Sequence, residues 1–125
     1  MTIVFFRDHD GSVPVKEWLD GEVAKRDSRI AAKCRVRISL LKEQGHSLRR
    51  PFADYLRDGI YELRIAFGRV NYRILYFFQK DSEAVVLAHG LTKEDDVPDR
   101  DIDLAVQRKV IFESDPEGHT YHETG

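Results

Sequence analysis

The chain has 125 residues, a length that suits one domain with one hydrophobic core. Its N-terminus lacks the pattern of a signal peptide and no apolar run approaches the ~20 residues needed to cross a bilayer, so we expect a cytoplasmic protein that does not contact a membrane. The single cysteine, Cys34, excludes an internal disulfide framework and a Cys-rich zinc site.

The net charge of −2 hides a strong asymmetry along the chain. Residues 25–80 hold 14 Lys or Arg against 5 Asp or Glu, whereas the remainder holds 6 basic and 17 acidic residues. Such an imbalance is typical of a surface that binds a polyanion, but a solvated helix surface would produce it too.

The N-terminal part predicts a strand and two helices. Residues 2–7 form a short apolar run, and Pro14 stands where a helix begins. Asp27 and Ser28 offer capping chemistry for a second helix, which Gly45 ends. The short connection predicts an antiparallel helix hairpin. The second helix has an apolar face (Ile30, Cys34, Ile38, Leu41) and a basic stripe (Arg29, Lys33, Arg37).

Three runs rich in β-branched and aromatic residues follow, at residues 60–67, 70–79 and 84–91. Turn-like segments separate them, which predicts an antiparallel meander whose middle strand is buried on both faces. A third helix begins near Asp99, where acidic side chains favour the helix dipole. The predicted order is β-αα-βββ-α, an α+β fold with a small antiparallel sheet in a single domain of residues 1–118, followed by a flexible tail of residues 119–125.

Two arginines, Arg64 and Arg73, stand inside these predicted strands. A guanidinium group is costly to bury without a partner, so each is either paired with a carboxylate such as Glu62 or available to bind an anion. On adjacent strands the two side chains can converge on one patch, and the fork of donors on arginine matches phosphate oxygens.

The segments Tyr61-Glu62-Leu63-Arg64, Tyr72-Arg73-Ile74-Leu75-Tyr76 and Val86-Leu87-Ala88-His89-Gly90-Leu91, in this order, resemble the RelE/ParE toxin superfamily, with the phage-derived HigB-like branch as the most similar group. The resemblance covers most of the chain and extends to the helix hairpin and the last helix. It implies a RelE-like fold and a bacterial type II toxin, an endoribonuclease that cuts messenger RNA on the ribosome without a metal or cofactor. It also implies that a helix-turn-helix antitoxin neutralises the toxin.

The resemblance assigns phosphate binding and transition-state stabilisation to Arg64 and Arg73, and phosphate binding or proton donation to Lys93. Arg69, in a predicted turn, would contact the RNA backbone, and so would Arg49 and Arg50 in the loop before Pro51.

His89 is a candidate general base because its titration lies near neutral pH, but it alternates in phase with Leu87 and Leu91, so a core histidine is the competing interpretation. Three tyrosines (Tyr61, Tyr72, Tyr76) could stack on bases or pack in the core, and the tail adds acid–base groups (His119, Tyr121, His122).

Two departures from the family pattern bear on activity. Glu62 occupies the place of a second basic residue, and three acids, Glu94, Asp95 and Asp96, follow Lys93 where the branch has further lysines. Carboxylates beside a phosphate site would repel RNA. The alternative function is therefore a superfamily member without nuclease activity that acts by binding a protein, as ParE-like toxins do on gyrase.

Overall fold

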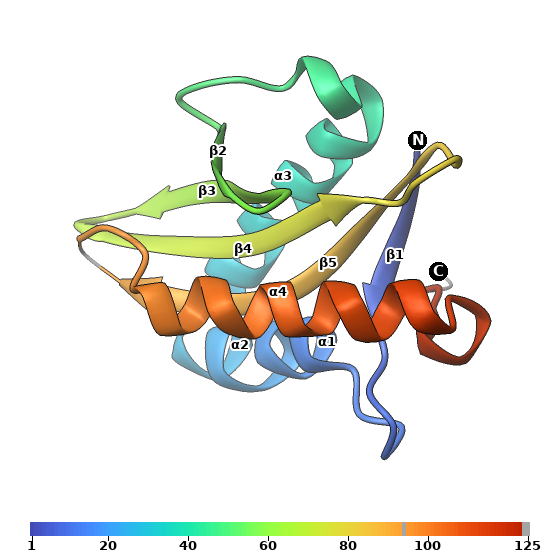
Figure 1. Ribbon diagram of the computed structural model, residues 1–125. Helices are drawn as coiled ribbons and strands as arrows, with labels where there is room; N and C mark the ends of the chain where they lie inside the picture. The colour runs from blue at the N-terminus through green and yellow to red at the C-terminus, as the bar shows by residue number, and fades with distance from the viewer. Residues whose placement is uncertain (94, 124–125) are drawn as a thin grey trace.

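A computed structural model describes residues 1–93 and 95–123, without the side chain of Lys93 (Figure 1). Its centre is a sheet of six strands in the order β2-β3-β4-β5-β1-β6. The strands are β1 (Thr2–Phe6), β2 (Ala53–Arg57), β3 (Ile60–Phe67), β4 (Val70–Phe78), β5 (Ala84–Lys93) and β6 (Thr120–Tyr121). The predicted α+β class is confirmed.

Helices cover both faces of the sheet (Figure 1). On one face lie α1 (Pro14–Trp18), a π turn (Leu19–Val23), α2 (Ala24–Arg26) and the long α3 (Ser28–Gln44). On the other face α4 (Asp99–Ser114) crosses the strands. Within the described residues no helix is long and apolar enough to cross a bilayer.

The helix boundaries follow the local signals. The Asp27 side chain accepts a hydrogen bond of 2.9 Å from the Arg29 backbone N–H and so caps α3, while Gly45 ends this helix with a positive φ of 51°. The α4 helix begins at Asp99, as predicted.

Two hydrophobic clusters form the core, one on each face of the sheet. The first packs α1 and α3 against the sheet and includes Trp18 and Cys34, both buried. The second packs α4 against the sheet and includes Phe77 and Phe112. The β4 strand supplies residues to both clusters, which confirms the predicted strand with two buried faces.

The sheet differs from the expected meander in three respects. The first is that β1 pairs with β5 in parallel, so the sheet is mixed rather than wholly antiparallel. The second is β2, which begins at the end of the loop expected over residues 46–54, continues into the segment that leads to the meander, and pairs with β3. The third is β6, formed by residues assigned to the C-terminal tail, which pairs with β1 at Phe5 and Phe6. The division into a domain of residues 1–118 and a tail stays a prediction.

Candidate functional site

Arg64 on β3 and Arg73 on β4 are directly opposite each other in the sheet. Residues in a cross-strand pair project from the same face, so the two guanidinium groups lie side by side. Arg73 is 7% exposed, while the side chain of Arg64 is about one third exposed. The expected convergence of the two arginines on one patch is what the β3–β4 register produces.

Both arginines approach the same carboxylate, that of Glu62, which is 2% exposed. The Arg64 Nε donates a hydrogen bond to Glu62 Oε1, and the Arg73 Nε lies 3.7 Å from Glu62 Oε2. Glu62 stands two residues before Arg64 on β3 and therefore shares its face. Ion pairing with Glu62 does occur, but one carboxylate faces two guanidinium groups, so a positive charge remains.

The charge network continues outward through β2. Asp54 lies 3.5 Å from Arg64 Nη2 and 2.7 Å from Arg50 Nη2. The Arg50 guanidinium, which is largely exposed, lowers the pKa of Asp54 by its hydrogen bond and its charge. Three arginines thus share two carboxylates, and the sheet face remains cationic.

Arg73 keeps unused hydrogen-bonding capacity. Its Nη1 donates to the backbone carbonyl of Asp95, but its buried Nε has no hydrogen-bond partner among residues 1–93 and 95–123. Leaving a buried donor unsatisfied costs free energy, of the order of 1–3 kcal/mol, unless a ligand or water satisfies it.

A cleft of about 480 Å³ opens beside this pair of arginines. We call it the β3-edge cleft, because it lies beyond the last β2 residue, where the edge of β3 has no strand neighbour among residues 1–93 and 95–123. Its lining comes from α3, the loop before β2, strands β3 and β4, and the segment between β5 and α4: Lys33, Arg37, Pro51, Phe52, Arg64, Ala66, Asn71, Arg73 and Asp96.

Two side chains from α3 complete the cationic lining. The Arg37 Nη1 donates to the carbonyl of Arg64 at 2.7 Å, and Lys33 Nζ donates to the carbonyl of Ala66. Both carbonyls belong to β3 beyond the last residue paired with β2. The basic stripe of α3 therefore binds the free edge of β3, which positions Lys33 and Arg37 at the cleft.

An aromatic side chain also lines the cleft. Phe52 is 38% exposed, and the Arg37 guanidinium carbon lies 4.3 Å from the centre of its ring. This cation–π contact orients both groups. Partial burial lowers the pKa of Arg37, although an arginine remains charged at neutral pH after such a shift.

His89 lies under α4 and does not line the β3-edge cleft. The register of β5 against β4 shifts next to Leu75, where a bulge inserts an extra residue. As a result His89 faces α4, together with Leu91, while Leu87 packs in the cluster on the opposite face. The prediction that His89 and Leu87 face the same side of the sheet is therefore wrong.

Both ring nitrogens of His89 are occupied. Nε2 lies 2.7 Å from Asp101 Oδ1, and Nδ1 lies 3.3 Å from Arg108 Nη1. Since guanidinium can only donate, we assign Nδ1 as the acceptor and Nε2–H as the donor to Asp101. Burial lowers the pKa of His89 and Arg108 lowers it further, while the hydrogen bond to Asp101 opposes the shift. His89 has the position of a structural histidine that joins β5 to α4.

The other predicted contact residues lie around the cleft rather than in it. Arg69 is exposed in the β3–β4 turn, two residues from Asn71. Arg49 and Arg50 are exposed in the loop before β2, beside a pocket of about 320 Å³ that Tyr55 and Tyr61 also line. The side chain of Lys93 lies outside the described residues, as does Glu94.

The candidate stacking and acid–base groups of the sequence are mostly buried elsewhere. Tyr72 and Tyr76 belong to the core cluster beside α1 and α3. His119 is 5% exposed, stacks on Phe6, and donates a hydrogen bond of 2.7 Å from Nδ1–H to the carbonyl of Arg7. The described polar lining of the cleft is thus made of four cations, Asn71 and the carboxylate of Asp96, and its apolar lining of Pro51, Phe52 and Ala66.

The sequence predicts Lys33 and Arg37 as part of a basic stripe without assigning them to this site, and it gives no signal for Phe52 or Asn71. The i, i+4 spacing of the basic stripe on α3 was a visible signal, but it does not indicate which edge of the sheet the stripe reaches. Among the described residues, no group of three His, Cys, Asp or Glu side chains is placed to hold a metal ion.

Comparison with known proteins identifies a family. Residues 22–110 match the family model described as "Phage derived protein Gp49-like (DUF891)", which spans α3, strands β2 to β5 and most of α4. No curated protein is significantly similar to the chain.

Proposed function

The chain belongs to the family of phage-derived Gp49-like proteins, within the RelE/HigB-like toxins, and we propose on that premise that it is a metal-independent endoribonuclease that cuts messenger RNA on the translating ribosome. The observation that carries the proposal is the pair Arg64–Arg73, set side by side at the wall of a cationic cleft. The cleft offers more positive charge than its carboxylates neutralise, and an RNA phosphate is the ligand that arginine pairs bind best.

The chemistry assigned to the cleft is attack by a ribose 2′-oxygen on the neighbouring phosphorus, with departure of the 5′-oxygen. Arg64 and Arg73 would bind the non-bridging phosphate oxygens and stabilise the charge that develops on them. The buried Arg73 Nε makes no hydrogen bond among residues 1–93 and 95–123 and faces Glu62 Oε2 at 3.7 Å, so it can bind a phosphate only after one of these two side chains moves. Lys93, at the end of β5, remains our candidate proton donor.

His89 is a weak candidate for the general base because Asp101 and Arg108 occupy both of its nitrogens. A base must lie within hydrogen-bond reach of the proton it takes, directly or through one water. Asp96, which lines the cleft and is exposed, is better placed for this role.

Phe52 and Arg37 support a nucleic-acid ligand over a free anion. An exposed aromatic ring next to a phosphate site allows an unpaired base to stack, and such stacking contributes roughly 1–3 kcal/mol per base. The two residues would hold the nucleotide that flanks the bound phosphate.

A second function, protein binding without nuclease activity, has one observation in its favour. The buried carboxylate of Glu62 contacts both arginines and offsets part of their charge. A ParE-like gyrase inhibitor or an inactive binding module would tolerate this neutralisation, whereas a phosphate site loses affinity from it.

The two functions are separated by inducible expression in bacteria and by mapping RNA 5′ ends in extracts that do or do not translate. The nuclease proposal predicts new ends within coding sequences, in translating extracts only, with growth arrest that Arg73→Ala abolishes. Lys25→Ala is the matched control, since Lys25 is exposed on α2 and does not line the cleft. Growth arrest that persists in Arg73→Ala without new RNA ends would reject the nuclease and favour protein binding.

The proposed partner is an antitoxin with a helix-turn-helix domain. Co-expression of the small protein encoded beside this chain should restore growth and yield a complex that survives size-exclusion chromatography. Failure of every adjacent open reading frame to restore growth would contradict the proposed pairing.

A further inference from the structure

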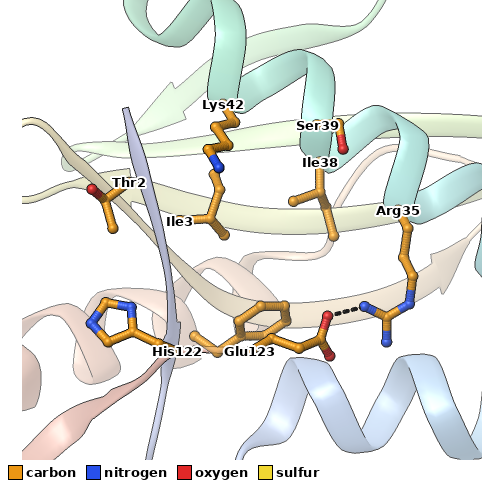
Figure 2. A pocket seen from close by; sticks show the side chains of 9 residues that line it. Thr2, Ile3, Arg35, Ile38, Ser39, Lys42, His122 and Glu123 are labelled. Carbon is orange, nitrogen blue, oxygen red and sulfur yellow. Dashed lines mark hydrogen bonds and ion pairs between the residues drawn. The ribbon is translucent and has the colours of Figure 1, made fainter. Parts of the chain in front are cut away.

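The α3 helix borders a second cleft on the side opposite the β3-edge cleft. Its flank with Lys33 and Arg37 reaches β3, while Arg35, Ser39 and Lys42 line a separate cleft of about 590 Å³ beside β1. We call this second one the β1-edge cleft. Figure 2 shows it between α3, β1 and the C-terminal residues His122 and Glu123.

The floor of the β1-edge cleft is apolar. Ile3 points from β1 toward α3 and Ile38 points from α3 toward it, and Phe5 belongs to the same hydrophobic cluster. Aliphatic and aromatic side chains of this kind favour a protein side chain as the occupant, because burying apolar area contributes about 25 cal/mol per Å².

The rim carries two cations, Arg35 and Lys42, and Arg35 is already paired with two carboxylates. Arg35 forms an ion pair with Glu123 (dashed in Figure 2) and a second one of 3.0 Å with Asp20. The two carboxylates fix the guanidinium at the mouth of the cleft. Lys42 is exposed on the same flank and has no ion-pair partner within residues 1–93 and 95–123.

The backbone beside the cleft is an open sheet edge. Among residues 1–93 and 95–123, β6 pairs with β1 at Phe5 and Phe6, and Thr2 to Val4 of β1 pair with β5 alone. An unpaired edge accepts an additional strand through its backbone N–H and C=O groups. The β6 strand itself shows that this edge accepts a short extended segment.

From the cleft, its apolar floor, its cations and the open edge of β1 we propose that the β1-edge cleft binds an extended acidic segment of a partner protein. An apolar side chain of that segment would pack against Ile3 and Ile38, and its carboxylates would pair with Arg35 and Lys42. Under the proposed function, on which this identification rests, the partner is the antitoxin. Arg35 and Lys42 are seven residues apart, about 10 Å along the helix axis. Extended residues i and i+2 are about 7 Å apart, so their carboxylates reach both cations.

Glu123 occupies the position of one of these carboxylates. The partner must displace it from Arg35, so the C-terminal segment acts as an internal competitor. Two substitutions should therefore change the affinity for the partner in opposite directions: Glu123→Gln should strengthen binding, whereas Lys42→Glu should weaken it.

The test uses the full chain and a fluorescein-labelled pentapeptide, Glu-Leu-Glu-Leu-Glu, with a counterpart in which Gln replaces every Glu. Anisotropy titrations at low salt measure both affinities for the parent and for Glu123→Gln, Lys42→Glu and Arg73→Ala. We expect the parent to bind the acidic peptide saturably and the Gln peptide at least tenfold more weakly. Lys42→Glu should bind the acidic peptide at least tenfold more weakly than the parent, and Glu123→Gln should bind it severalfold more tightly. Arg73→Ala, which alters only the β3-edge cleft, should bind the peptide as the parent does.

Three outcomes would overturn the inference. The first is that the acidic peptide shows no saturable binding to Glu123→Gln. The second is that Arg73→Ala lowers the affinity for the acidic peptide whereas Lys42→Glu does not. The third is that the parent binds the acidic peptide and the Gln peptide with equal affinity. A labelled single-stranded RNA serves as a further arm: if Lys42→Glu weakens RNA binding but not peptide binding, the cleft takes nucleic acid instead of protein. None of these results depends on nuclease activity, so failure here and failure of the proposed function are distinguishable.

Discussion

Replacing Glu62 with Gln removes the charge that Arg64 and Arg73 share while keeping the shape of the side chain. Glu62 is 2% and Arg73 7% exposed, so the substitution leaves a buried guanidinium without its counter-charge. Removing one partner of a buried ion pair costs about 3–5 kcal/mol. The Gln Oε1 can still accept from Arg64, whose partly exposed pair contributes at most about 1 kcal/mol. We therefore expect a loss near the lower limit, about 3 kcal/mol in the free energy of unfolding.

Urea unfolding followed by the fluorescence of Trp18 measures this loss, because Trp18 is the single tryptophan and is buried. Glu43→Gln is the matched control, since Glu43 is exposed on α3, and it should lie within about 0.5 kcal/mol of the parent. If Glu62→Gln were as stable as Glu43→Gln, the carboxylate would not be the counter-charge of Arg73. The electrostatic account of the site would then be refuted.

Three further predictions concern the core and α4. Burial lowers the pKa of His89 below its usual 6.5, so on acidification the unfolded chain binds a proton before the folded one does. The free energy of unfolding should therefore fall as pH drops below about 6.5. Urea titrations at several pH values should show a smaller fall for His89→Gln than for the parent. Gly90→Ala would place a methyl group against the indole of Trp18, and calorimetry should show a destabilisation of about 1–3 kcal/mol, whereas an unchanged melting temperature would contradict this packing. Burial raises the pKa of the Cys34 thiol to about 11, so iodoacetamide should modify it only after unfolding, and rapid labelling of the native chain would show that α3 opens.

Local signals in the sequence determine much of this fold. Gly68 predicts the β3–β4 turn and adopts a positive φ there, and Asp27 and Gly45 mark the two ends of α3. Each of these signals acts within a few residues, so the sequence alone is sufficient to detect it. The parallel pairing of β1 with β5 joins segments about 80 residues apart, and no local pattern specifies such a partner.

The strands that were missed are short or lie next to loop signals. Pro51 and the arginines before it favour a loop, yet β2 begins two residues after Pro51 because Ala53 pairs with Leu63. The bulge in β5 also lacks a clear sequence signal. One inserted residue turns His89 to the opposite face of the sheet from Leu87, so the strict alternation of faces along a strand does not hold there.

The candidate site was predictable in part for the same reason. The pairing of Arg64 with Arg73 follows from the length of the β3–β4 turn, which local sequence encodes. The contribution of Lys33 and Arg37 depends on how α3 crosses the sheet, a tertiary feature set by two core clusters. That one carboxylate, Glu62, contacts both arginines also depends on side-chain geometry that only the structure provides.

The salt dependence of RNA binding tests most directly whether Arg64 and Arg73 bind a phosphate. A labelled single-stranded oligoribonucleotide is titrated by anisotropy at several salt concentrations against the parent, Lys25→Ala and the double variant Arg64→Ala/Arg73→Ala. If the two arginines bind one phosphate together, the double variant should lose at least tenfold in affinity, and the slope of log K against log salt should become shallower by about 0.7. An affinity and a slope equal to those of Lys25→Ala would contradict the account.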